Sequence, residues 1–448
     1  MNGTATAYRT RTTRRSVRHP LRAEALRGFG PLAGAAVALS LVVALAGRAR
    51  TWQGGWAETA DTLHTILLVG IPLAAAAGCW QGGRERRRGT TELWETAARG
   101  PLSRLLVSAL PVAFWVAAGY LLTVAGALLA TWPYARGDHP HPALVPGSTT
   151  AMAAAALLGH LVGRLVPTRL AAPLLAMAGY VGLGAATVRS GSLSPLNPAA
   201  TLADDVLPVW WQPLAMTVWT GGLALAAALA YAARRRTTAV LPLAAAVAAG
   251  ALLVGTGDGL WHTDPLTRRQ VCDTTTTPAV CVNARYARLL PQVRDALSGV
   301  TGKLAGVPGL PARWADRPGG PHTDEARLPM LTPLGWHFVR GRLIDPEQFA
   351  WEAVTELSGQ GDCPYDEEPS DRAHRADDAV EAYLAPGRTR KYVDEIDARG
   401  DRAHRTDLRA RLAARARLAG MGERERWAWL SAYFAARGRC DTKGVPAL

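Results

Sequence analysis

Residues 84–104 read RERRRGTTELWETAARGPLSR, a charged interruption of 21 residues between two long apolar runs. The middle of this stretch predicts a short helix that lies flat on a bilayer, with an apolar stripe on one face and polar residues on the other. The stripe consists of Leu93, Trp94, Ala97 and Ala98, and the polar face of Glu92, Glu95 and Thr96. Glu92 suits the positive end of the helix dipole, and Glu95 forms an i,i+4 pair with Arg99. Gly100 and Pro101 then end this helix and begin the next one.

This pattern resembles the permease subunits of ABC-2 type ABC transporters. The likeness lies in an E-R-x-x-G-T-x-E-L run, a short amphipathic helix, and P-x-S-R leading into an apolar helix. In that family a basic loop between the second and third transmembrane helices carries a coupling helix that docks into a separate ATPase. The resemblance implies ATP hydrolysis by a cytoplasmic ABC ATPase and a dimer with a second permease copy or a homologue. The residues that it assigns to ATPase coupling are Glu92, Leu93, Trp94, Glu95 and Arg99. The alternative is that any multi-pass membrane protein needs basic cytoplasmic loops.

Seven apolar runs are long enough to cross a hydrocarbon core, which takes about 20 residues. They cover residues 30–47, 63–82, 105–131, 149–166, 171–188, 213–233 and 239–260. With a cytoplasmic N-terminus, the predicted inside segments hold 18 arginines and the predicted outside loops hold 4. Because arginine-rich loops stay in the cytoplasm, this asymmetry predicts a multi-pass protein of the plasma membrane with an extracellular C-terminal region. The fourth and fifth runs are short and are separated only by residues 167–170.

The N-terminal residues 1–29 are basic ahead of the first apolar run. Val17, Leu21, Ala25 and Phe29 recur every four residues, which predicts an interfacial elbow helix. ABC-2 permeases often begin in this way. A cleaved signal peptide is the alternative for a basic stretch that precedes an apolar one.

The distribution of charge argues against nucleic acid as a partner. The net charge is +14, but residues 1–260 hold 22 arginines against 10 acids, and residues 261–448 hold 28 Lys plus Arg against 26 acids. The excess therefore lies between the predicted membrane spans and acts as an orientation signal. The chain divides into a transmembrane domain, 30–260, with its coupling loop at 83–104, and a soluble domain, 261–448.

Polar residues inside apolar runs are costly and need a reason. His160, Tyr120 and Tyr180 are candidates for a translocation path, with hydrogen-bonded helix contacts as the alternative. The link at residues 192–213 is expected to form partly inserted helices on the outer side, as ABC-2 permeases often do. The alternative is an ordinary loop whose Trp210–Trp211 pair joins an aromatic belt.

Four of the five cysteines lie in the C-terminal region, where an oxidising compartment permits disulfides. Cys272 with Cys281, and Cys363 with Cys440, are the expected pairs, although the sequence leaves all three pairings open. Cys79 is expected to pack inside the second span.

Helical patterns cover much of the C-terminal region, and Gly306–Pro333 is expected to be loop. The helical segments are Ala284–Leu304, Pro346–Leu357, Ala373–Leu384, Thr406–Leu418 and Glu423–Arg437. The echoed segments DRAHRAD (371–377) and DRAHRTD (401–407) are interpreted as solvated helix faces, so no metal site is predicted.

The sequence contains no GxxxxGK[ST], HExxH or GxSxG motif. We therefore expect a transport subunit without catalytic residues or a cofactor of its own, with ATP hydrolysed on a partner chain. The VC…VC start and the YARLLP run of the C-terminal region look similar to tails appended to some actinobacterial ABC-2 type permeases.

The predicted fold class is thus an all-α polytopic membrane protein of about seven transmembrane helices with an ABC-2 type core, followed by a mainly helical, disulfide-containing extracytoplasmic domain. The favoured function is the permease subunit of an ATP-driven exporter. The alternatives are a membrane-anchored receptor or assembly protein that transports nothing, and an enzyme in the C-terminal region.

Overall fold

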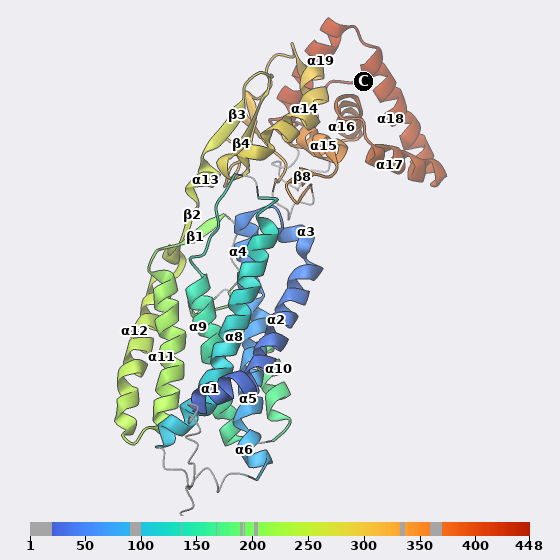
Figure 1. Ribbon diagram of the computed structural model, residues 1–448. Coiled ribbons are helices and arrows are strands. Elements are labelled where there is room, and N and C mark those ends of the chain that lie inside the picture. The colour runs from blue at the N-terminus through green and yellow to red at the C-terminus, as the bar shows by residue number, and fades with distance from the viewer. Residues whose placement is uncertain are drawn as a thin grey trace, which may run out of the picture.

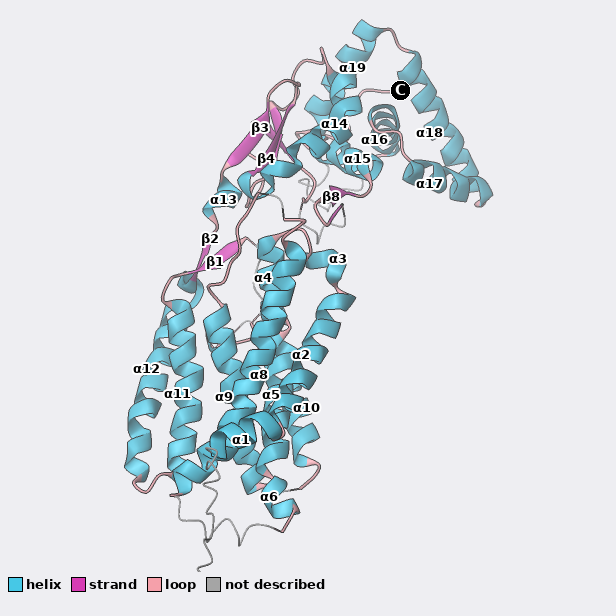
Figure 2. Cartoon of the chain, viewed as in Figure 1, coloured by secondary structure: helices cyan, strands magenta, loops and turns pink. Residues whose placement is uncertain are grey.

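The computed structural model describes residues 20–89, 100–135, 137–166, 168–188, 191, 193–200, 205–331, 337–358 and 370–448. A bundle of long helices is joined at one end to a region of helices and short strands (Figures 1 and 2). We call residues 261–448 the tail. The end of the bundle next to it is the tail-side end, and the opposite end, where α1 (Pro20–Arg27) and α6 (Arg84–Arg87) lie, is the arginine-rich end.

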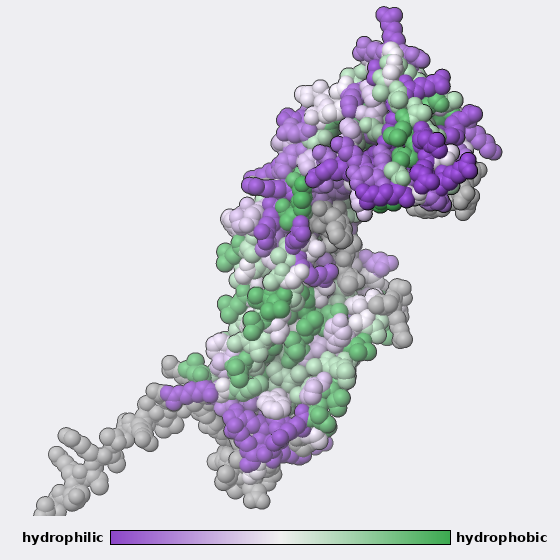
Figure 3. Space-filling model, turned by 90° about the vertical axis from the view of Figure 1, so that its right-hand side faces the viewer, coloured by the Kyte–Doolittle hydropathy of each residue, from purple (hydrophilic) through white to green (hydrophobic). Residues whose placement is uncertain are grey.

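Six helical stretches among the described residues are long and apolar enough to cross a membrane: Gly30–Gly47, Trp56–Gly82, Pro101–Thr131, Val145–Leu165, Gln212–Ala232 and Arg236–Leu260. They correspond to α2 (Gly30–Gly47), α4 (Trp56–Thr65) with α5 (Leu67–Gly82), α8 (Pro101–Thr131), α9 (Val145–Leu165), α11 (Gln212–Ala232) and α12 (Val240–Thr256) with its flanking turns η2 (Arg236–Ala239) and η3 (Gly257–Leu260). The second stretch begins at Trp56, so the predicted start at residue 63 was too late. Figure 3 shows hydrophobic residues along this bundle, between the hydrophilic tail and a hydrophilic patch at the opposite end.

Close helix packing at the centre of the bundle depends on two pairs of glycines. Gly78 and Gly82 of α5 face Gly159 and Gly163 of α9, and each pair is separated by three residues. A Cβ at Gly78 would lie 1.9 Å from the Ala156 carbonyl oxygen, and one at Gly159 would lie 1.9 Å from the Ala75 oxygen. The backbones therefore approach as in small-xxx-small membrane helix pairs.

The helix α10 (Ala171–Val188) is also apolar, but its apolar part, Ala171–Thr187, is shorter than the six stretches named above. Its first residues, Ala171 and Ala172, pack with Cys79 near the end of α5. Near its other end, Ala186 and Thr187 line a cavity with the starts of α9 and α11. The helix thus runs between the two ends of the bundle, while a seventh membrane crossing stays a prediction.

The tail contains a four-stranded sheet that the sequence did not predict. Its strands are β3 (Gln270–Asp273), β4 (Ala279–Asn283), β5 (Arg313–Ala315) and β6 (Glu325–Arg327), in that order. The β3–β4 pair is antiparallel, and β4–β5 and β5–β6 are parallel. The expectation of loop for 306–333 was therefore wrong at β5 and β6. A small antiparallel pair, β7 (Phe338–Val339) and β8 (Arg342–Leu343), follows.

All five predicted helical segments of the tail are helical. They are η4 (Ala284–Leu289) with α14 (Leu290–Leu304), α15 (Pro346–Leu357), α16 (Asp371–Leu384), α18 (Arg402–Gly420) and α19 (Glu423–Arg437). One hydrophobic core joins these helices to the sheet, with Trp314, Phe349 and Tyr433 fully buried.

A further helix, α17 (Arg388–Arg399), buries none of its residues and was not predicted. Ion pairs hold it to its neighbours instead: Arg390 to Asp378 of α16 at 2.6 Å, and Arg415 of α18 to Asp394 at 2.6 Å.

The tail disulfide between Cys272 and Cys281 joins directly opposed residues of β3 and β4, as expected. Cys440 is also disulfide-bonded, and Cys363, its predicted partner, lies outside the described residues. Cys79 is a buried free thiol in α5, as expected.

Candidate functional site: buried polar groups of the helix bundle

The residues predicted to couple to an ATPase, Glu92, Leu93, Trp94, Glu95 and Arg99, lie outside the described residues. The flanks of this stretch are described. Before it, α6 (Arg84–Arg87) forms a short basic helix directly after α5. After it, α8 begins at Pro101 with Gly100 as the preceding cap residue, as the sequence predicted.

The structure does not bring together the three residues predicted for a translocation path. His160 of α9 is buried, and its Nε2 lies 3.1 Å from the Ser108 Oγ of α8. Tyr120 is buried on the same helix as Ser108, but 12 residues further along, which is about 18 Å in an α-helix. Tyr180 is 50% exposed on α10. His160 therefore has the hydrogen-bonded helix contact that was the alternative interpretation, and Tyr180 faces away from the bundle interior.

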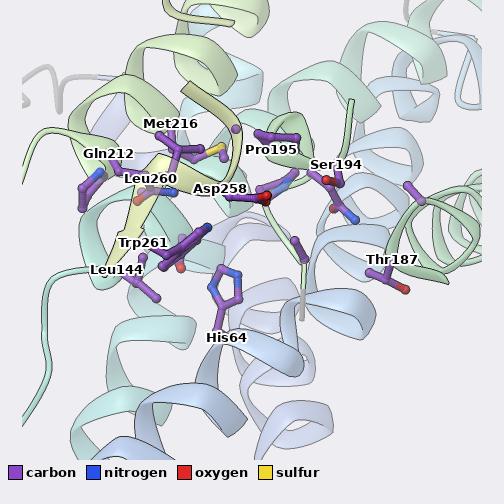
Figure 4. A pocket seen from close by; sticks show the side chains of 18 residues that line it. His64, Leu144, Thr187, Ser194, Pro195, Gln212, Met216, Asp258, Leu260 and Trp261 are labelled. Atoms are coloured by element: carbon purple, nitrogen blue, oxygen red, sulfur yellow. The ribbon is translucent and has the colours of Figure 1, made fainter. Parts of the chain in front are cut away.

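A cavity of about 230 Å³, lined by both polar and apolar side chains, lies at the tail-side end of the bundle (Figure 4). It is enclosed by the end of α4, the starts of α9 and α11, the turn after α12, and the link that follows α10. Its polar lining includes His64, Ser148, Asn197, Gln212, Asp258 and Trp261.

Two lining side chains hold polar atoms without a partner among the described residues. They are Nδ1 of His64 and Oε1 of Gln212, which are buried atoms on residues only 9% and 4% exposed. A buried polar group without a hydrogen bond costs free energy. The cavity is therefore suited to a bound water molecule or a small polar ligand that offers both a donor and an acceptor.

The link after α10 forms one wall of this cavity. It contains a short turn, η1 (Ser194–Leu196), and Asn197 fixes it by donating to the Leu183 oxygen at 3.3 Å. Trp219 of α11 donates to the Leu196 oxygen at 3.1 Å. Partly inserted helices were predicted for residues 192–213, and the described part of this link before α11 contains one short helical turn, η1. Trp210 is 82% exposed, as an interfacial residue would be.

Beside the cavity, the tail is fastened to the bundle. Strand β1 (Val206–Pro208) pairs with β2 (Trp261–Thr263), and the Tyr286 hydroxyl donates to the buried Glu58 carboxylate of α4. The Arg340 backbone N–H donates to the Gln53 oxygen at 3.2 Å, and its Nε donates to Oε1 of Gln53 at 2.7 Å.

Buried charges complete this junction. Arg285 lies 2.9 Å from Asp264 and 3.8 Å from Asp138, and all three side chains are only 3% exposed. Burial opposes the charge of Asp264, yet hydrogen bonds from the Leu266 N–H and Arg285 hold the pKa of this carboxyl below its usual value. Asp264 therefore stays ionised in the junction and keeps its ion pair with Arg285.

The sequence did not indicate these residues, since Glu58 precedes the predicted start of the second span and Asp138 lies between the third and fourth apolar runs. An acid next to an apolar run is the signal that identifies Glu58, because such a residue is costly unless it is paired.

One group of side chains in the described ranges has the composition of a metal site. Asp138, His139 and His141 place one potential ligand atom each within 4.8 Å of one another. However, Asp138 already pairs with His141 at 2.8 Å and faces the Arg285 guanidinium, whose positive charge opposes a cation there. We interpret the group as part of the ion-paired junction.

Comparison of the chain with protein families, characterised proteins and solved structures finds no match.

Proposed function

We propose that this chain is the membrane-spanning permease subunit of an ATP-driven exporter of ABC-2 type, energised by a separate ATPase that docks on residues 84–104. The single observation that carries a transport role is the tail-side cavity, which lies between helix ends and holds two buried polar atoms without partners in the part of the chain that the structure describes. A cavity with several polar side chains inside a membrane bundle suits a site where a substrate is held during passage.

Two features at the arginine-rich end support the exporter type. The helix α1 (Pro20–Arg27) precedes the first long helix and is tied to α8, because Trp115 donates to the Ala25 oxygen at 2.6 Å. It occupies the place of the expected interfacial elbow. The basic α6 follows the second long stretch and leads into the proposed coupling segment.

The transport cycle that we propose is alternating access. Closure of the ATPase would push on residues 84–104 and shift α5 against α8, the helices on either side of this segment. Since α5 is locked to α9 by close glycine contacts, the two helices would move together and open or close the tail-side cavity. The tail, held by Glu58 and Arg340, would follow the same motion.

Replacing Trp94 tests this proposal. A buried aromatic anchor is worth about 2 kcal/mol or more at an interface, so Trp94→Ala is expected to weaken the complex with the ATPase about thirtyfold. Copurification of an ATPase in mild detergent measures this. The matched control is Trp210→Ala, which removes an 82% exposed tryptophan at the opposite end. Equal recovery of the ATPase with wild type and both variants, or no ATPase with any of them, would contradict the coupling segment.

A membrane-anchored receptor or assembly protein is the second candidate. The observation that favours it is the tail-side junction, where strand pairing, hydrogen bonds and buried ion pairs fix the tail on the bundle as a permanently displayed unit. This function needs no ATPase, so the same copurification separates the two candidates.

A further inference from the structure

At the arginine-rich end of the bundle, four separate segments surround an open cavity of about 650 Å³. The end of α1, the end of α5, α6, and the residues just before α10 contribute to it. Five of its nine lining residues are arginines: Arg27, Arg84, Arg87, Arg88 and Arg169. The others include Trp80 and Gln81.

Among the side chains that the structure describes, the positive charge of this cavity is only partly balanced. Glu24 lies 3.7 Å from Arg84 and is the one carboxylate paired with a lining arginine among the described ion pairs. Arg87 stacks on Trp80 at 4.6 Å from the ring centroid and donates to the Trp80 oxygen, so its guanidinium is fixed in place. Burial, and after it the like charge of Arg169, holds the pKa of Arg87 below its usual value. The arginines therefore repel one another and favour an anion between them.

A buried acceptor completes the cavity. Gln81 is 6% exposed, its Nε2 donates to Glu24 at 3.2 Å, and its Oε1 has no partner among the described residues. An acceptor beside several arginines suits a ligand that carries both a phosphate and a hydroxyl group.

The surroundings of the cavity indicate where such a ligand comes from. Leu26 on α1, and Leu170 and Leu174 at the start of α10, are 62%, 68% and 55% exposed. Trp80 is 43% exposed, as expected for an aromatic residue at a membrane interface. The hydrophilic patch at this end meets the hydrophobic flank of the bundle (Figure 3). An anionic headgroup bound among the arginines would therefore leave its acyl chains next to apolar side chains.

We propose that this cavity binds the phosphate of an anionic phospholipid headgroup, with phosphatidylglycerol as the best match. Basic pockets between membrane helices on the cytoplasmic side are suited to such headgroups. The lipid would join α1 to α5 and α10 at the base of the bundle. Lipid binding here does not rest on the proposed transport function, since it requires no ATPase and no substrate, but Arg84, Arg87 and Arg88 also belong to the segment proposed to dock the ATPase.

The test uses the full-length protein in mild detergent, with native mass spectrometry to count bound phosphatidylglycerol and phosphatidylcholine. Arg88→Gln combined with Arg169→Gln removes two exposed arginines of the cavity without disturbing the core. We expect it to weaken phosphatidylglycerol binding about tenfold or more and to leave phosphatidylcholine binding unchanged. The matched control is Arg235→Gln with Arg236→Gln, two exposed arginines at the same end but outside the cavity. It is expected to bind within about twofold of wild type.

A comparison with inorganic phosphate shows whether the bound phosphate group belongs to a lipid or to a free anion. The lipid assignment predicts that phosphatidylglycerol raises the melting temperature of wild type and that millimolar phosphate alone does not. If phosphate alone stabilises the protein and displaces the lipid, the site takes free phosphate and the lipid assignment is wrong. Equal phosphatidylglycerol binding by wild type, cavity variant and control would overturn the site altogether.

Discussion

Glu325, on strand β6 of the tail, is held by two arginines. Its carboxylate lies 2.7 Å from Arg313 on the neighbouring strand and 2.8 Å from Arg317, and the side chain is fully buried. Burial opposes the charge, but the hydrogen bonds from Arg317, the His322 N–H and Arg313 hold the pKa of Glu325 at about 2, below its ordinary value of 4.5. The carboxylate is therefore a source of stability only while it is ionised.

The pH dependence of the tail follows from this shift. Because the folded pKa lies below the unfolded one, the stabilisation is complete above about pH 4.5 and is lost as the pH falls toward 2. At roughly 1.4 kcal/mol per pKa unit, the complete loss is on the order of 3.5 kcal/mol, of which about 2 kcal/mol has occurred by about pH 3. Glu325→Gln is expected to remove this acid sensitivity and to destabilise the tail at neutral pH.

Urea unfolding of the full-length protein, followed by circular dichroism from about pH 6 to about pH 3, measures this effect. The control is Glu395→Gln on α17, whose side chain is 65% exposed and should leave the pH profile unchanged. If the stability of Glu325→Gln depends on pH in the same way as that of wild type, another group causes the loss of stability in acid.

For single residues, the sequence predicted a contact only where the two partners belong to one local pattern. The Cys272–Cys281 bridge spans nine positions across one hairpin, and the structure contains it. Glu325 was not found, since its partner Arg313 stands in a stretch rich in Pro and Gly that carries no local pattern. The pairing exists only because β5 and β6 lie side by side.

Of the helix contacts in the bundle that depend on glycine, the contact between α5 and α9 is the closest. Gly159→Ala would place a Cβ 1.9 Å from a backbone oxygen of α5, which no side-chain movement relieves. We expect a loss of roughly 1–3 kcal/mol, as for other overpacked cores, and a lower melting temperature in detergent. Gly126→Ala on α8 is the matched control, because nothing lies within 4 Å of its added Cβ. Equal melting temperatures would contradict the close approach of α5 and α9.

The sequence predicted the apolar helices and most tail helices because each carries its own periodicity. It missed α17, which contributes no residue to the core and is held by arginine–carboxylate pairs with α16 and α18. It missed the sheet because β4 pairs with β5, more than 30 positions away, through strands of only three to five residues. Pairing between such short and distant segments leaves no periodic signal in the sequence.

For the whole molecule, the order of the helices bears on the side of the membrane that each end faces. The chain enters the bundle at the arginine-rich end, beside α1, and leaves it at the opposite end, where the tail begins (Figure 1). Six crossings would return the chain to the end where it started. If all six long apolar stretches cross the membrane, one further crossing is needed to bring the chain to the opposite end, and we expect α10, which runs between the two ends, to provide it.

We accordingly expect seven crossings, with the arginine-rich end in the cytoplasm and the tail outside, as the distribution of 18 and 4 arginines predicts. Single cysteines at Arg235 and Pro318, both exposed positions, report on the two ends. In intact cells a membrane-impermeant thiol reagent should label Pro318→Cys and leave Arg235→Cys unlabelled. Both should react after permeabilisation, which controls for access. The native thiol Cys79 is buried and is replaced by serine to remove background. Labelling of Arg235→Cys in intact cells would reverse the orientation, and labelling of neither position would place the tail in the cytoplasm.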